Sequence, residues 1–165
     1  MSKEKKFRLT SLCSHNEVDI LRKFADIVDD FCTSNQKKLC AHNGKEFDFP
    51  FISRRLLLHG IALPDVLNTP GKKPWEVNHL DTMELWKFGD YKSYTSLALL
   101  AAVFDIPSPK DDIDGSQVGD VYWKENDLQR ISKYCEKDVL TIAQILRRFR
   151  NEELIPDDAI EWVNQ

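Results

Sequence analysis

A long amphipathic segment toward the C-terminal end constrains the fold of this chain more than any other feature. Over residues 127–152, apolar side chains recur at intervals of three, four and seven, the spacing of one face of an α-helix. Asn126 and Gln129 resemble a capping box at the start of this segment. We therefore expect a long helix with one packed face. The apolar face consists of Leu128, Ile131, Cys135, Ile142, Ile145 and Phe149.

The same face contains an acidic residue where the spacing predicts an apolar one. Asp138 occupies that position, and Tyr134 lies one turn earlier on the same side. A buried carboxylate needs a cation or several hydrogen-bond donors to compensate its charge. Asp138 could be a structural residue paired with an arginine or with backbone amides, and Tyr134 could be a core aromatic residue. As a pair, they are typical of an acid and a phenol that share a functional site.

The elements before this helix alternate between strands and helices. Asn16 can cap the first helix, and Asp81 with Glu84 resembles a capping box for a short helix. The tail after Pro156 is expected to form one more short helix. The pattern predicts an α/β protein with a single domain over residues 1–165. Strands are expected at 7–14, 38–42 and 77–80, helices at 17–31, 49–59 and 97–106, and loops at 64–77 and 108–126.

A second candidate acid lies at the start of the helix at 49–59. Asp48 follows the strand at 38–42 and the turn dipeptide Asn43-Gly44. Asp is a preferred helix N-cap, and Pro50 suits a first helical turn, so this arrangement could be purely structural. Carboxylates from two elements of an α/β sheet can also converge, and hard divalent cations need such oxygen ligands. Asp48 and Asp138 are therefore candidate metal ligands.

Composition argues against several classes of protein. The net charge of -4 and the pI of about 5.6 disfavour sequence-independent binding to duplex nucleic acid, which needs a basic face. The 4 cysteines form no CxxC pair, so we expect buried free thiols in a reducing, cytoplasmic location rather than a zinc site or disulfides. No apolar run approaches the ~18 residues of a membrane span, and the charged start does not resemble a secretory signal.

Two segments resemble motifs of a known enzyme family. The stretch HNGKEFDFPF at 42–51 resembles the second motif of the DEDD 3'-5' exonucleases, which are DnaQ-like proteins. The stretch YCEKD at 134–138 matches Tyr-x3-Asp, the third motif of the tyrosine-containing DEDDy branch. HLDTMELW at 79–86 resembles the strand between these motifs. The likeness extends over nearly the whole chain and is greatest to bacterial exonucleases related to the proofreading domain of family-B DNA polymerases.

The resemblance implies a fold, an activity and roles for five residues. The fold would be ribonuclease H-like, with three layers and a mixed sheet. The activity would be hydrolysis of the terminal phosphodiester at a nucleic-acid 3' end with two Mg²⁺ or Mn²⁺ ions. Asp48 and Asp138 would bind metal, and Tyr134 would orient the attacking water. Asn43 and Gly44 would lie beside the substrate strand, because a glycine permits close approach.

The expected partner is the 3' end of single-stranded or frayed DNA. An RNA exonuclease is the alternative within the same enzyme class, because contacts to the 2'-hydroxyl are not readable from these residues. A catalytically silent domain that binds nucleic-acid ends or a protein partner is the alternative of another class. We expect no membrane association.

The chain departs from the family pattern in its first motif. Asp-x-Glu does not occur before residue 40. Glu17 and Asp19 have the same spacing in the reversed order, and they lie at the start of a predicted helix. We therefore expect a sheet that lacks its first strands, a truncated site with weak metal binding, and little or no nuclease activity. The loss of central strands would expose the apolar face of the helix at 17–31, so the fragment is also expected to self-associate.

Overall fold

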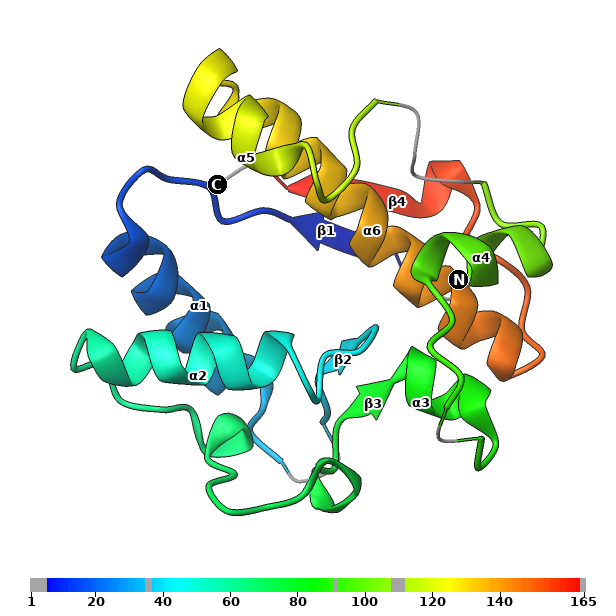
Figure 1. Cartoon of the computed structure of the whole chain (residues 1–165), viewed down its shortest axis with the longest axis horizontal. Helices are drawn as coiled ribbons and strands as arrows, with labels where there is room; N and C mark the ends of the chain where they lie inside the picture. Colours follow the sequence, from blue (N-terminus) through cyan, green and yellow to red (C-terminus); the bar gives the residue numbers. More distant parts are fainter. Residues whose placement is uncertain (1–5, 35–36, 91, 108–111, 164–165) are drawn as a thin grey trace, which may run out of the picture. The chain divides into compact units, whose positions relative to one another are not determined.

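The computed structural model describes residues 6–34, 37–90, 92–107 and 112–163 (Figure 1). The chain divides into two compact units, one of residues 14–94 and one that combines 1–13 with 95–165. The single domain expected from the length of the chain stays a prediction. No helix in the described part of the chain has the length and apolarity needed to cross a membrane.

The 14–94 unit contains a helical pair and a short parallel pair of strands. Cys40 lies opposite Leu80 in the strand pair, and Ala41 lies opposite Asp81. This register places Asp81 beside the strand that leads into the turn at 42–47. The elements are α1 (Glu17–Phe31), β2 (Cys40–Ala41), α2 (Asp48–Leu58), β3 (Leu80–Asp81) and α3 (Thr82–Lys87), with 3-10 turns at Asp65–Leu67 and Pro74–Glu76.

The apolar face of α1 is covered within its own unit. Leu21 and Ala25 pack with Leu56 of α2 and Leu67 of the first 3-10 turn in one buried cluster. Self-association was expected from exposure of this face, and the part of the face that carries Leu21 and Ala25 is covered here. Phe31, at the end of α1, is exposed. Self-association itself stays a prediction.

The other unit packs its longest helix against a second parallel pair of strands. Figure 1 shows α6 running across the β1–β4 pair, and α6 contacts both β1 and α4. The expected long loop after α4 contains short helical turns of its own. The elements are β1 (Phe7–Thr10), α4 (Leu97–Val103), α5 (Val118–Asp120), a π-helical turn (Val121–Glu125), α6 (Leu128–Phe149), a 3-10 turn (Asp157–Ala159) and β4 (Ile160–Val163).

The tail after Pro156, where one more short helix was expected, forms a 3-10 turn at Asp157–Ala159 and then continues as the strand β4. β4 pairs in parallel with β1, with Phe7 opposite Ile160. The Thr10 hydroxyl donates a hydrogen bond to the Val163 carbonyl at 2.8 Å, across 153 positions of sequence. β-Branched side chains suit this pairing, but only a partner distant in sequence makes it available.

The described residues form two separate two-stranded parallel sheets, not the one mixed sheet that the resemblance implied. β2 and β3 are 2 residues long. The pair cannot extend, because the turn at 42–47 follows β2 and the Asp81 side chain already caps α3. The strand predicted at 77–80 is accordingly displaced to Leu80–Asp81. The α/β class is confirmed, and the three-layer ribonuclease H-like arrangement stays a prediction.

The helix starts confirm one predicted cap and correct another. Asn16 caps α1, and its side-chain oxygen accepts a hydrogen bond from the Val18 N–H at 3.1 Å. α6 is capped by Asp127, whose carboxylate accepts from the Arg130 N–H at 3.0 Å. The predicted cap, Asn126, instead adopts a left-handed φ of 54° and ends the preceding turn. Asn tolerates this conformation better than most residues, which explains its position one residue before the true cap.

The four cysteines are free, but the prediction that they are buried is wrong. Cys13, Cys40 and Cys135 are exposed, and Cys32 is partly exposed. For Cys135 the reason lies in the packing of α6. The buried residues of this helix, Thr141, Gln144 and Ile145, belong to its C-terminal half. The N-terminal half, which carries Cys135 on the predicted apolar face, is therefore more accessible than the periodicity indicated.

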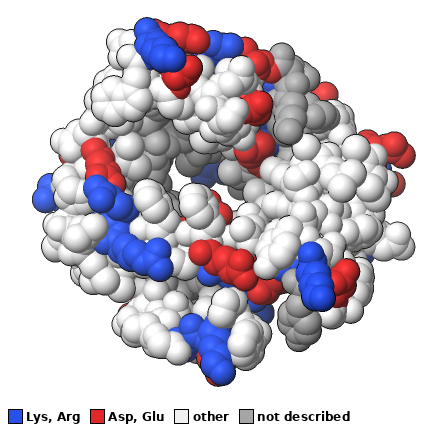
Figure 2. Space-filling model, in the orientation of Figure 1, with Lys and Arg blue, Asp and Glu red and all other residues white. Residues whose placement is uncertain are grey.

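Charged side chains of both signs are mixed over the face of the molecule in Figure 2. Lys and Arg atoms lie next to Asp and Glu atoms there, and no continuous basic surface is visible on this face among the described residues. Within the 14–94 unit, for example, Lys45 Nζ lies 2.8 Å from Glu84 Oε2.

Candidate functional site

The turn between β2 and α2 carries three of the predicted site residues. Asn43 has a left-handed φ of 61°, and its carbonyl accepts a hydrogen bond from the Phe47 N–H at 3.1 Å. The Gly44 carbonyl accepts one from the Phe49 N–H at 2.9 Å. Asp48 is exposed and is the first residue of α2, whose N-cap is Phe47. Asp48 is therefore not the N-cap, which its purely structural interpretation required.

Gly44 is required by the packing of this turn. A Cβ atom at Gly44 would lie 2.3 Å from the Ala41 Cβ and 3.2 Å from the Phe49 ring. The first distance is far inside van der Waals contact, and the Ala41 Cβ cannot rotate away. Local packing thus explains the glycine without any ligand. Its proposed closeness to a substrate strand stays a prediction.

Asp81 holds the turn in position from the end of β3. One carboxylate oxygen accepts hydrogen bonds from the Asn43 N–H at 2.9 Å and the Met83 N–H at 3.0 Å. The other oxygen accepts from the Lys45 N–H at 3.1 Å. Asp81 is only 2% exposed, and hydrogen bonds from amides to a buried carboxylate are strong ones. One side chain therefore caps α3 and also fixes the turn that precedes Asp48.

Sequence reasoning identified the cap and missed the link to the turn. Asp81 and Glu84 were expected to form a capping box, but the Glu84 carboxylate pairs with the Lys45 ammonium instead. The side chains of Asp81, the N-cap of α3, and of Glu84 in α3 therefore both contact the turn between β2 and α2. The available signal was an acid at the end of a short strand expected to neighbour the strand at 38–42.

The surroundings of Asp48 raise the pKa of its carboxyl group. Desolvation by neighbouring protein atoms is the largest cause that raises the pKa of Asp48, and the Asp81 charge raises it further. The Asp48 backbone amide and His42 act in the opposite direction. The Asn43 Oδ1 atom is buried and has no hydrogen-bond partner among the described residues. An unsatisfied carboxylate or amide oxygen is the type of ligand that Mg²⁺ and Mn²⁺ prefer.

Tyr134 and Asp138 interact on α6, as their spacing predicted. Burial is the largest cause that raises the pKa of Tyr134 to about 12, followed by the charge of Asp138 and a hydrogen bond to it. The phenol is therefore protonated at neutral pH and can donate to the Asp138 carboxylate. Asp138 is half-buried, so its environment is less enclosed than a core position would be. Its charge can still act strongly on the hydroxyl one turn away.

The loop before α5 adds a third acid that sequence reasoning did not single out. Asp114 also raises the pKa of Tyr134 through its charge. A Cβ atom at Gly115 would lie 3.7 Å from the Tyr134 hydroxyl, so the loop passes directly beside this group. Asp114 accepts hydrogen bonds from the Ser116 N–H and hydroxyl, which orient its carboxylate. The loop at 108–126 therefore contributes to the surroundings of Tyr134.

The predicted site residues carry oxygen donors, the type of ligand that hard divalent cations prefer. Asp48 and Asn43 offer oxygen atoms in one unit, and Asp138 offers a carboxylate in the other. Within the part of the chain that the structure describes, no group of three or more His, Cys, Asp or Glu side chains could hold a metal ion.

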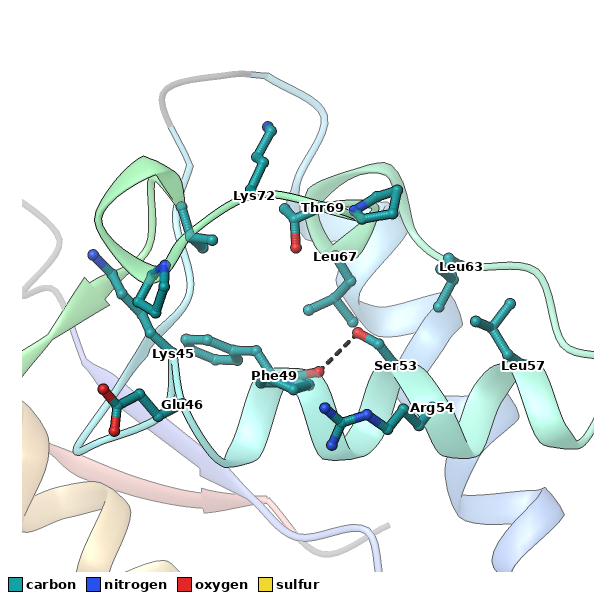
Figure 3. Close-up of a pocket in the computed structure, with 14 residues that line it drawn as sticks. Lys45, Glu46, Phe49, Ser53, Arg54, Leu57, Leu63, Leu67, Thr69 and Lys72 are labelled. Carbon is teal, nitrogen blue, oxygen red and sulfur yellow. Dashed lines mark hydrogen bonds between the residues drawn. The ribbon is translucent and has the colours of Figure 1, made fainter.

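An apolar cavity of about 490 Å³ lies between α2 and the segment that follows it (Figure 3). Phe49 and Leu57 of α2 line one side, and Leu63 and Leu67 line the other. The Ser53 hydroxyl donates to the Phe49 carbonyl at 2.7 Å, so it is engaged within the helix. The described walls of the cavity contain none of the predicted metal ligands.

Comparison of the chain with models of known protein families identifies its family. A family model described as a predicted 3'-5' exonuclease related to the exonuclease domain of PolB matches residues 1–153. The chain belongs to this family. The matched region of this exonuclease family member includes both motif-like segments, at 42–51 and 134–138. No curated protein and no solved structure gives a significant match to the chain. Membership supports a nuclease of the hydrolase class, and exonucleases of this kind typically use divalent metal ions.

Proposed function

We propose that this chain is a metal-dependent 3'-5' exonuclease domain that acts on the 3' end of single-stranded or frayed DNA. The observation that carries the proposal is the Tyr134–Asp138 pair, which occurs as Tyr-x3-Asp in a chain that matches the exonuclease family over residues 1–153. DNA is preferred to RNA because the family is described by its relation to a DNA polymerase domain.

Asp48 and Asp138 are the proposed metal ligands. Desolvation and the Asp81 charge raise the pKa of Asp48, and a bound dication would stabilise the ionised carboxylate. Bound Mg²⁺ or Mn²⁺ would lower the pKa of a water molecule and neutralise charge on the attacking and leaving oxygens.

Tyr134 is the proposed water-orienting residue. With a pKa of about 12, its hydroxyl keeps its proton at neutral pH and is not a general base. When the Tyr134 hydroxyl donates its hydrogen to Asp138, the lone pairs of the hydroxyl oxygen can still accept a hydrogen bond from water. Tyr134 would thus position a water molecule without taking its proton.

Asn43 and Gly44 are the proposed contacts to the substrate strand. Asp81 holds the backbone of this turn, so the Asn43 side chain would be presented in one orientation. The unsatisfied Asn43 Oδ1 can accept a hydrogen bond from a base or sugar hydroxyl.

Metal binding by these residues alone is expected to be weak. The family pattern includes an Asp-x-Glu pair on a strand, and no such pair occurs before residue 40. Glu17, the first acid of the reversed pair, binds the Arg55 and His59 side chains and is committed to that contact. Two carboxylates therefore replace the four of the family pattern.

A manganese titration of the full chain tests the metal ligands without relying on activity. Amide signals of the uniformly ¹⁵N-labelled protein are recorded by NMR, and paramagnetic broadening is followed as Mn²⁺ is added. We expect early broadening around Asp48 and around Tyr134–Asp138, reduced in each region by Asp48→Asn and Asp138→Asn. Asp29→Asn, an exposed acid on α1, is the control and should change neither region. Broadening that begins elsewhere, or that is unchanged in both variants, would overturn the assignment.

A further inference from the structure

A second cavity of the 14–94 unit, of about 450 Å³, is polar and basic. None of the proposed metal ligands or strand contacts is among its described lining residues, so it is separate from the residues assigned to exonuclease chemistry. It shares Thr69 and Lys72 with the walls of the apolar cavity in Figure 3. Its lining includes Ser34, Lys37, Lys38, Thr69, Lys72 and His79.

His79 is the buried polar group of this cavity. It is 7% exposed, and its ring nitrogens make no well-formed hydrogen bond with the described residues, apart from a looser one with the Val66 backbone. Its ring packs against the Phe49 ring, with 4.6 Å between centroids, so it is held in place. A buried imidazole that is incompletely hydrogen-bonded costs free energy unless water or a ligand satisfies it.

Positive charge converges on the same ring. Burial is the largest cause that lowers the pKa of His79, and a hydrogen bond with the Val66 backbone acts in the opposite direction. The charges of Lys45, Lys38 and Lys72 lower this pKa further. These ammonium groups are therefore close enough to create a positive potential at the imidazole. The chain as a whole has a net charge of -4, so this local excess of positive charge is opposite in sign to the net charge.

The lysines of the cavity are not neutralised by the described carboxylates around them. Asp65 is the one acid among the described lining residues, against Lys37, Lys38 and Lys72. None of the ion pairs between described residues involves Lys38 or Lys72. Lys37 Nζ lies 4.6 Å above the Phe31 ring, a contact that keeps its charge available.

We propose that this cavity binds a phosphate group. Hydroxyl, amide and ammonium donors surround it, and a phosphate has enough acceptor oxygens to use several of them at once. A volume of about 450 Å³ is larger than a phosphate ion needs and leaves space for the sugar of a phosphate ester. The phosphate could come from a free mononucleotide or from the backbone of a nucleic-acid strand. The inference does not depend on the exonuclease proposal, because it uses neither metal nor hydrolysis.

The test is an NMR titration of the full, metal-free chain in a buffer without phosphate or sulfate. Three probes are added separately: inorganic phosphate, thymidine 5'-monophosphate, and an oligothymidylate that carries no terminal phosphate. The signals followed are the His79 ring and the amides of Thr69 and Lys72. We expect saturable shifts with at least one probe, which sodium chloride at the same ionic strength does not reproduce. Shifts with the first two probes alone indicate a mononucleotide site, and shifts with the oligothymidylate indicate a strand site.

Lysine variants show whether the cavity itself binds. Lys38→Gln and Lys72→Gln should each weaken binding about three- to tenfold, the effect of losing one charge-assisted contact. Lys23→Gln, an exposed lysine of α1 in the same unit, makes the same charge change outside the cavity and should have no effect. Lys38 and Lys72 are both exposed, so these variants should fold. No shift of the His79 ring with any probe, or equal weakening by Lys23→Gln, would overturn the proposal.

Discussion

The Asn43 N–H donates a hydrogen bond of 2.9 Å to the Asp81 carboxylate, which links two residues 38 positions apart in the sequence. Asp81→Asn would replace a carboxylate oxygen by an NH₂ group that faces backbone N–H donors. We expect the free energy of unfolding to fall by about 3 kcal/mol, since buried amide donors lose a charged acceptor. Urea denaturation followed by circular dichroism measures this loss. Asp29→Asn should lie within about 0.5 kcal/mol of the wild type; a similarly small effect of Asp81→Asn would contradict the role assigned to this carboxylate.

Gly44→Ala should destabilise the protein by overpacking. The added Cβ would lie 2.3 Å from the Ala41 Cβ, so the turn or β2 must shift, at a cost of about 1–3 kcal/mol. The double variant Ala41→Gly/Gly44→Ala removes this clash and should recover part of the loss. Gly119→Ala is the matched control, because a Cβ added there would meet no described atom within 4 Å. Thermal denaturation of the four proteins provides the comparison, and equal melting temperatures for Gly44→Ala and Gly119→Ala would refute the packing argument.

The contact of Glu17 with Arg55 should make stability depend on pH. The hydrogen bond from Arg55, followed by that from His59, lowers the pKa of Glu17 to about 2 from an ordinary value of 4.5. A carboxyl whose pKa is lower in the folded state contributes stability above its unfolded pKa and loses it as the pH falls through the folded pKa. Glu17→Gln should therefore be less stable than the wild type near pH 6, and the difference should shrink between about pH 4.5 and 2. Denaturant midpoints over this range check the prediction, which a pH-independent difference would contradict.

Tyr134 should titrate later than an ordinary tyrosine, with a pKa of about 12. Asp138→Asn removes a negative charge beside the phenol and should move this pKa toward 10.0, although burial keeps it somewhat raised. Ultraviolet titration follows the phenolate, and subtraction of the Tyr134→Phe profile isolates this residue. Asp29→Asn should leave the profile unchanged. A Tyr134 that titrates identically with and without the Asp138 charge would show that the two side chains do not interact.

Digestion of a 5'-labelled single strand in Mg²⁺ or Mn²⁺ should be slow with this chain. We expect a low rate of nucleotide release from the 3' end, further reduced in Asp48→Ala and in Tyr134→Phe. Tyr94→Phe is the control, since the Tyr94 ring is exposed and contacts Lys87 rather than an acid. Parallel DNA and RNA strands distinguish the two substrate classes. Robust activity that Asp48→Ala abolishes would show that two carboxylates suffice, and would overturn the expectation of weak metal binding.

Local patterns in the sequence predicted the parts of the site that lie on one element. Tyr134 and Asp138 are one helical turn apart, so the periodicity of α6 was enough to bring them together. The turn at Asn43 and the start of α2 near Asp48 were likewise readable from turn and helix propensities. The depth of burial was not readable, because amphipathic spacing does not reveal that only the C-terminal half of α6 is enclosed.

The sequence by itself determined the order of most helices and strands, the family to which the chain belongs, and the Tyr134–Asp138 pair. Each of these depends on residues that are close in the chain or on a motif that they form. Only the tertiary structure decided that the tail pairs with β1, that Asp81 fixes the turn before Asp48, and that His79 is buried where the charges of three lysines act on it. These features depend on hydrogen bonds, packing and electrostatic fields between distant segments, and no local propensity specifies which distant partner a segment will meet.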